Sequence, residues 1–174
     1  MIYKNRIYIL LILLSIIFLK GCGIYSFTGV STDAETITIN SFFHEADAGP
    51  PDLGQRFTDE IRDYFQQNTS LEMVEEEGQL FFEGAVTDWR LTPVSAQASR
   101  NPDDINTAAQ TRLTITVSVN FADVNHPEND FSRTFSFYSD FDNEVSVSEV
   151  EDDLIEEIFE QIILNIFNAS VANW

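Results

Sequence analysis

Residues 113–141, LTITVSVNFADVNHPENDFSRTFSFYSDF, decide the fold class of this chain. Apolar residues alternate with Thr, Ser and Asn from Leu113 to Phe121, and the phenylalanines from Phe131 to Phe141 share one parity. Strict alternation is typical of a β-strand with one buried face. Between the two strands, residues 123–130 predict a turn, because proline cannot donate a hydrogen bond within a sheet. We therefore predict an antiparallel hairpin with one apolar face.

Apolar residues spaced three and four apart predict a helix on each side of this hairpin. The first helix follows Pro51 and Asp52, which suit a helical first turn and the positive end of its dipole. The second follows residues 148–151, SEVE, which we expect to form a capping box beginning at Ser148. The apolar stripes comprise Leu53, Phe57, Ile61, Tyr64 and Phe65 in the first helix, and Leu154, Ile155, Ile158, Phe159, Ile162, Ile163, Ile166 and Phe167 in the second.

Further strands are expected before the hairpin. Residues 36–40 alternate strictly, with Phe43 continuing their apolar parity, and residues 71–74 form a short candidate strand. Residues 80–91 carry apolar side chains on both parities, which indicates a central or two-sided strand, and the polar residues 92–109 indicate a long loop. We therefore predict an α+β fold, with two helices packed on one face of a mainly antiparallel four-stranded sheet.

The first 22 residues have the pattern of a secretory signal. Two basic residues precede an apolar run at 7–19, which is shorter than the about 20 residues that a membrane-spanning helix needs. The run ends in LKGC at 19–22, which is similar to the lipobox of bacterial lipoproteins, although Lys20 departs from it. We predict a signal peptide at 1–21, lipidation of Cys22, a tether at 22–34 and one domain at 35–174. The alternative is an uncleaved anchor with an incidental cysteine.

The charge of the chain excludes some partners. The full sequence has 29 Asp and Glu against nine Lys and Arg, a formal charge of −20. After residue 21 there are six arginines, no lysine and all 29 acids, a charge of −23. Such a chain is neither a nucleic-acid binder nor a polybasic membrane binder. Lysine-free acidic surfaces stay hydrated when molar salt shortens the Debye length to about 3 Å, so we expect a high-salt periplasm.

Residues suited to catalysis or metal binding are scarce. His44 and His126 are the only histidines, and both fall in or beside turns. His44 with the neighbouring acids could contribute to a metal site, but a solvated polar cluster is the better interpretation, because zinc sites usually need three or four spaced ligands. Acidic residues at 75–77 and 103–104 lack the periodicity of a calcium-binding loop. We predict no enzyme, no metal and no cofactor besides the lipid on Cys22; a hydrolase is the least favoured alternative.

Several short segments resemble one known family when they are taken together. Residues 21–29, GCGIYSFTG, resemble the start of the LptE lipoproteins in the form found among Bacteroidetes-type bacteria. The resemblance covers essentially all of the chain after the apolar run. The other segments that carry it are Pro51-x-Leu53, Gly84-x-Val86-x-x-Trp89, TPVS at 92–95, TRLTI at 111–115, IFN at 166–168 and NW at 173–174.

The resemblance implies a non-enzymatic role. Members of this family sit as a plug inside the large outer-membrane β-barrel LptD, assist its assembly and help to pass lipopolysaccharide to the cell surface. It therefore implies an LptD-like barrel and lipopolysaccharide as partners, a lipid anchor in the outer membrane, and a domain facing the periplasm and the barrel lumen. The alternative is a periplasm-facing accessory or scaffold lipoprotein of another envelope complex.

Three arginines are candidates for polar contact with lipopolysaccharide or the barrel. Arg90, Arg100 and Arg112 bracket the long loop. Pairing with nearby acids is an equally good interpretation of these residues. A surface this negative would need bridging divalent ions to bind a phosphorylated lipid directly.

Overall fold

The computed structural model describes residues 32–94 and 110–172. The signal sequence, Cys22, Arg100 and the acids at 103–104 lie outside these residues. The elements are β1 (Thr36–Ile39), β2 (Phe43–His44), α2 (Leu53–Asn68), β3 (Glu72–Met73), β4 (Leu80–Val94), β5 (Gln110–Asp123), the 3₁₀ turn η1 (Pro127–Asn129), β6 (Phe131–Asp142) and α3 (Val147–Ser170).

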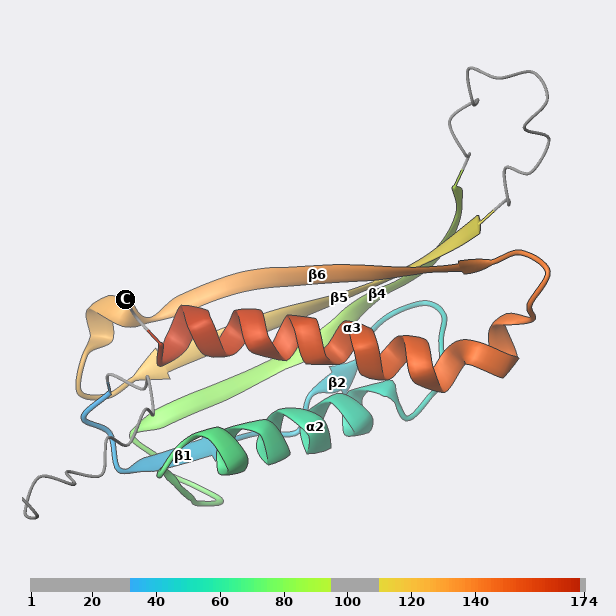
Figure 1. Ribbon diagram of the computed structural model, residues 1–174. Coiled ribbons are helices and arrows are strands. Elements are labelled where there is room, and N and C mark those ends of the chain that lie inside the picture. Colours follow the sequence, from blue (N-terminus) through green and yellow to red (C-terminus); the bar gives the residue numbers. More distant parts are fainter. Residues whose placement is uncertain (1–31, 95–109, 173–174) are drawn as a thin grey trace, which may run out of the picture.

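Both helices lie on the same face of one sheet, which confirms the predicted α+β class (Figure 1). The sheet is mixed and has six strands rather than four, in the order β3-β1-β4-β5-β6, with β2 also paired to β4. Strands β4, β5 and β6 are antiparallel, whereas β1 is parallel to both β3 and β4. Parallel neighbours need a crossover connection, and α2 lies in the connection from β1 to β3 and β4.

The core lies between the helices and the sheet. In α2, Leu53, Phe57, Ile61 and Phe65 are completely buried, as the predicted stripe requires. The ring of Phe57 meets that of Phe159 in α3 edge to face, with the centroids 5.0 Å apart. Full burial of each such side chain contributes about 1.5–3 kcal/mol, so this aromatic layer holds the helices on the sheet.

A β-bulge explains why the core-facing residues of β4 change parity along the strand. The register with β5 shifts between Val86 and Asp88, which leaves Thr87 as the extra residue. Val86 before the bulge is buried, and Trp89 after it packs against the same core. One face of the strand therefore takes even positions before the bulge and odd positions after it.

The N-terminal strand ends earlier than predicted. β1 stops at Ile39, and the chain re-enters the sheet as β2, beside β4. The backbone N–H of Phe42 donates to Thr58 Oγ1 in α2 at 2.8 Å. Phe42 is consequently buried, and Phe43, which we expected to continue the apolar parity, is 69% exposed.

Two other boundaries differ from the sequence prediction. The N-cap of α3 is Ser146 rather than Ser148, and its N–H donates to the Glu149 carboxylate at 3.3 Å. The expected loop at 92–109 begins later, because residues 92–94 continue β4 and pair with β5. Neither described helix has the length and apolar content needed to cross a bilayer.

Candidate functional site

Within residues 32–94 and 110–172, no helix packs on one broad surface of the sheet. We call it the uncovered face: the side of β4, β5 and β6 opposite to α2 and α3. Its side chains are mostly short and polar, and some join adjacent strands, as where Thr116 Oγ1 donates to Ser136 Oγ at 3.1 Å. Cross-strand rows on this face are Glu83–Asn120–Ser132, Ala85–Ser118–Thr134, Asp88–Thr116–Ser136, Arg90–Thr114–Tyr138 and Thr92–Arg112–Asp140.

Arg112 lies on the uncovered face and is held by β6. Its Nε donates to Asp140 Oδ1 at 2.7 Å and its Nη2 donates to Oδ2 at 2.9 Å. The guanidinium also lies over the Tyr138 ring, with Cζ 3.5 Å from the ring centroid. The hydrogen bonds to Arg112 hold the pKa of Asp140 below its usual value, and those to Asp140 raise the pKa of Arg112. The Arg112 guanidinium is therefore held in one orientation. Asp140 balances its charge, and the Tyr138 ring stacks on it.

Arg90 lies on the same face, one cross-strand row away from Arg112, and pairs with Asp88. Both candidate arginines among the described residues are thus paired with an acid on a neighbouring or the same strand. Arg100 lies outside the described residues. The contact of these arginines with lipopolysaccharide or the barrel stays a prediction.

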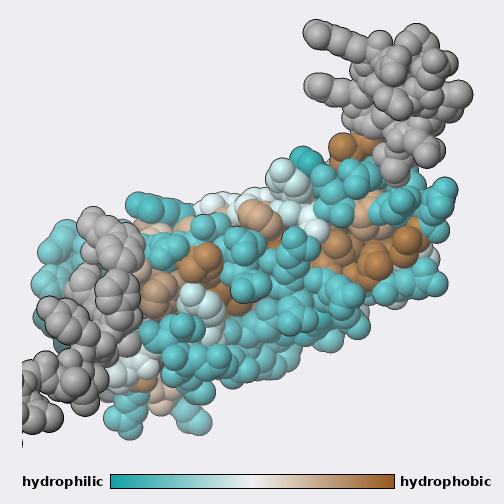
Figure 2. All heavy atoms as spheres, in the orientation of Figure 1, coloured by the Kyte–Doolittle hydropathy of each residue, from teal (hydrophilic) through white to brown (hydrophobic). Residues whose placement is uncertain are grey.

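Apolar surface gathers where the sheet runs past the helices. The last residues of β4 and the first residues of β5 bend away from the helix layer (Figure 1). Figure 2 shows apolar surface beside the start of α3. Leu91 near the end of β4 is 43% exposed, and Val145 just before α3 is 36% exposed.

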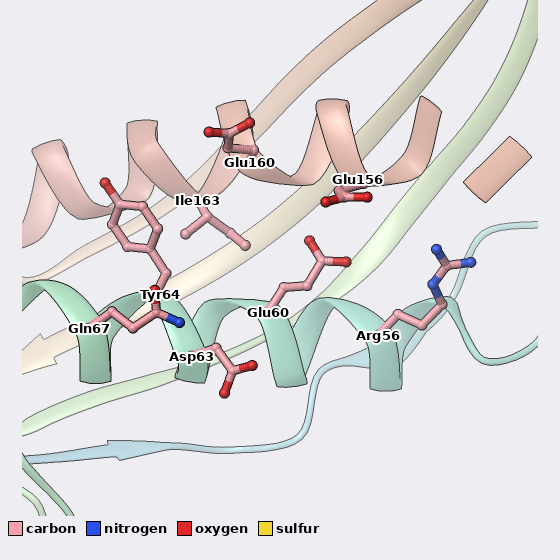
Figure 3. A pocket seen from close by; sticks show the side chains of 8 residues that line it. All are labelled: Arg56, Glu60, Asp63, Tyr64, Gln67, Glu156, Glu160 and Ile163. Carbon is pink, nitrogen blue, oxygen red and sulfur yellow. The ribbon is translucent and has the colours of Figure 1, made fainter. Parts of the chain in front are cut away.

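A groove between the two helices brings four acids and one arginine together (Figure 3). Its lining includes Glu60 and Asp63 from α2, and Glu156 and Glu160 from α3. The carboxylates of Glu60 and Glu156 point toward one another across the groove. At one end, Arg56 Nη1 lies 2.8 Å from Asp152 Oδ1 and ties the helices together.

Glu60 is the most perturbed acid in this groove. Burial raises its pKa from 4.5 to about 7; Arg56 opposes that rise, while Glu156 and Asp63 add to it. Burial and the charge of Glu160 likewise raise the pKa of Tyr64. Sequence reasoning missed this groove, because acids are common throughout the chain and no motif distinguishes these four.

The two histidines lie apart. The Nδ1 atom of His44 is buried and has no hydrogen-bond partner among the described residues. His126 lies beside the η1 turn, with its Nε2 3.3 Å from Asp33 Oδ1 and its Nδ1 3.4 Å from Glu128 Oε1. These two acids raise the pKa of His126. Within residues 32–94 and 110–172, no three His, Cys, Asp or Glu side chains are grouped as metal ligands.

Comparison with known families identifies the chain. The family described as LptE, lipopolysaccharide-assembly, matches residues 34–170, which span all the helices and strands above. The chain belongs to the LptE family. Membership makes it a lipopolysaccharide-assembly protein and agrees with the resemblance found in the sequence. Among curated proteins, none shows a significant sequence match to the chain.

Several solved structures are similar to this LptE protein at low sequence identity. A putative neuraminyllactose-binding hemagglutinin homolog from Helicobacter pylori has a TM-score of 0.51 and 8% identity, over 77% of this chain and 81% of that one. The hypothetical protein CT253 from Chlamydia trachomatis has a TM-score of 0.49 and 12% identity, over 80% of this chain and 99% of that one. The rare lipoprotein B from Shewanella oneidensis has a TM-score of 0.41 and 12% identity, over 76% and 89%.

Proposed function

We propose that this protein is an outer-membrane lipoprotein, anchored through a lipid on Cys22, that plugs an LptD-like β-barrel and helps to assemble it. In that position it faces the periplasm and the barrel lumen and assists lipopolysaccharide transport to the cell surface. The observation that carries the proposal is the family match, since residues 34–170 include every helix and strand of the part of the chain that the structure describes.

The uncovered face supports a role as a plug. Hydroxyl and amide side chains lie in rows across β4, β5 and β6, and the charges of Arg90 and Arg112 are already matched by acids. Short polar side chains form direct and water-mediated hydrogen bonds without the desolvation cost of an unpaired charge. Such a face suits a hydrophilic barrel wall.

The same pairing bears on lipid binding. A lipopolysaccharide phosphate at Arg112 would meet a guanidinium whose charge is already balanced by Asp140, which accepts hydrogen bonds from two of its five N–H donors. We propose that the protein acts by binding and positioning, without catalysis.

Co-purification tests the proposal. The tagged full chain, expressed at its native level, is extracted from membranes in mild detergent. We expect it to retain a very large outer-membrane β-barrel, whereas recovery as a free monomer would count against the plug role. The Cys22→Ala variant is expected to remain as precursor and to lose metabolic palmitate labelling; labelling that persists would remove the lipid anchor at this residue.

A further inference from the structure

A second groove lies on the uncovered face, where β2 runs beside β4. We call it the Phe43 groove; its lining includes Phe43, Glu45, Glu83, Ala85, Ser118 and Asn120. Its volume of about 310 Å³ is at the small end of the range of ligand pockets, roughly 300–1,000 Å³. The groove therefore has room for a single small ring rather than for an extended ligand.

Phe43 presents an aromatic ring at the edge of this groove. Its side chain is 69% exposed, yet its backbone is fixed, because β2 pairs Phe43 with Ala85 of β4. On the N-terminal side Phe42 is hydrogen-bonded to Thr58, and on the C-terminal side the N–H of Glu45 donates to the Val86 carbonyl at 2.9 Å. The backbone that carries the ring is therefore already ordered, so no backbone freedom is lost on binding.

The rest of the lining is small or polar. Ala85 lies opposite Ser118, and Glu83 lies opposite Asn120, across β4 and β5. The Asn120 amide nitrogen donates a long hydrogen bond of 3.4 Å to Glu83 Oε1. The second amide hydrogen, the amide oxygen and the other carboxylate oxygen retain hydrogen-bonding capacity for a ligand. Ala85 and Ser118 are small and leave space for a ligand. Glu83 and Asn120 supply hydrogen-bond acceptors and donors.

We infer that the Phe43 groove binds a neutral sugar ring of an envelope glycan. A pyranose has an apolar C–H face, whose hydrogens are attracted to the negative face of an aromatic ring. Its hydroxyl groups donate to a carboxylate such as Glu83 and accept from an amide such as Asn120. Glu45 and Glu83 both line the groove, so phosphate and carboxylate ligands are repelled while neutral hydroxyls are not.

This inference goes beyond the plug role and does not depend on it. Neutral sugar rings occur in the core oligosaccharide of lipopolysaccharide and in other glycans of the envelope. The two sources share the chemistry recognised here, so the experiment separates them with two probes.

Binding is measured on the full chain in a detergent without a sugar headgroup, by calorimetry and saturation-transfer NMR. The probes are dephosphorylated, lipid-free core oligosaccharide and chitotriose. Wild type is expected to bind at least one of them; preference for the core identifies lipopolysaccharide as the source, and preference for chitotriose identifies another glycan. Absence of binding to both overturns the inference.

Variants connect binding to the groove. Phe43→Ala is expected to weaken the affinity about tenfold, and Phe43→Trp to retain it, because the stacking face is removed in one and kept in the other. Val124→Ala is the matched control, since Val124 is 68% exposed and lies outside the groove. Affinity of Phe43→Ala equal to that of wild type overturns the inference. Circular dichroism verifies folding, and unchanged co-purification of the barrel separates sugar binding from the plug role.

Discussion

At the residue scale, Glu60 carries a charge that its surroundings oppose. Burial, Glu156 and Asp63 outweigh Arg56 and raise its pKa to about 7, from 4.5. The folded state therefore binds more protons than the unfolded state between about pH 4.5 and 7, and stability falls as the pH rises through this window. The raised pKa of His126 acts in the same direction, because its stabilising pairs with Asp33 and Glu128 are complete below its unfolded pKa and are lost as it deprotonates.

We predict that Glu60→Gln raises the free energy of unfolding at pH 8 by on the order of 1 kcal/mol, a value reduced for partial solvent exposure. The free energy of unfolding of the variant should also fall less between pH 5 and 8 than that of wild type. His126 is unchanged in the variant, so its contribution to this fall remains. Urea unfolding at both pH values measures this. Asp59→Asn, an exposed neighbour in α2, is the matched control. Equal pH profiles for the two variants would contradict the prediction.

Single-residue environments were the hardest features to predict from the sequence. The pairing of arginines with acids was anticipated as an alternative, but Asp140 as the partner of Arg112 depends on the register of β5 and β6. Glu60 could not be distinguished among 29 acids, because its environment arises only when α2 and α3 meet. Phe42 and Phe43 are adjacent phenylalanines, and the hydrogen bond to Thr58 decides which one is buried.

At the element scale, the start of α3 offers a direct test. Ser146 is the N-cap and forms a capping box with Glu149: the Ser146 side chain faces the Glu149 N–H, and the Ser146 N–H donates to the Glu149 carboxylate at 3.3 Å. We predict that Ser146→Ala lowers the free energy of unfolding by about 1 kcal/mol, the usual value for loss of a serine N-cap. Ser148→Ala, two residues inside the helix, should cost less, because alanine is the better helix former there. Thermal unfolding measures the stability of both variants. A larger loss of stability in Ser148→Ala than in Ser146→Ala would indicate that Ser148 is the N-cap.

Elements with a local pattern were predictable, and non-local pairing was not. The stripes of α2 and α3 and the alternation of β5 and β6 each follow from one periodic segment with one buried face. β1 and β3 are short, and their parallel pairing joins residues 36–37 to 72–73 without a turn signal. The bulge at Thr87 changes parity within a continuous strand, which a fixed period of two cannot describe.

At the scale of the whole molecule, three of the five described arginines are paired with an acid, and acids are in large excess. Arg56, Arg90 and Arg112 each contact an acid, and the helix groove places four carboxylates near one another. Like charges at this density repel one another in dilute buffer, and salt screens the repulsion.

We predict that the melting temperature rises between 0.1 M and 2 M KCl. The Debye length is about 10 Å at 0.1 M and about 3 Å at 1 M, so repulsion across the acidic surface is removed over this range. Differential scanning calorimetry of the full chain measures the change. A melting temperature that is no higher in molar salt than in 0.1 M KCl would contradict adaptation to a high-salt periplasm.

The central claim, that the uncovered face lies against an outer-membrane barrel, is tested most directly by photo-crosslinking in living cells. A photoreactive amino acid replaces Thr134, an exposed residue on the uncovered face, and Asp153 on the exposed side of α3 serves as the control. We predict that the Thr134 position gives one adduct with a very large outer-membrane β-barrel, in higher yield than the Asp153 position. Adducts from Thr134 with a different envelope protein alone, or none where Asp153 gives them, would contradict the claim.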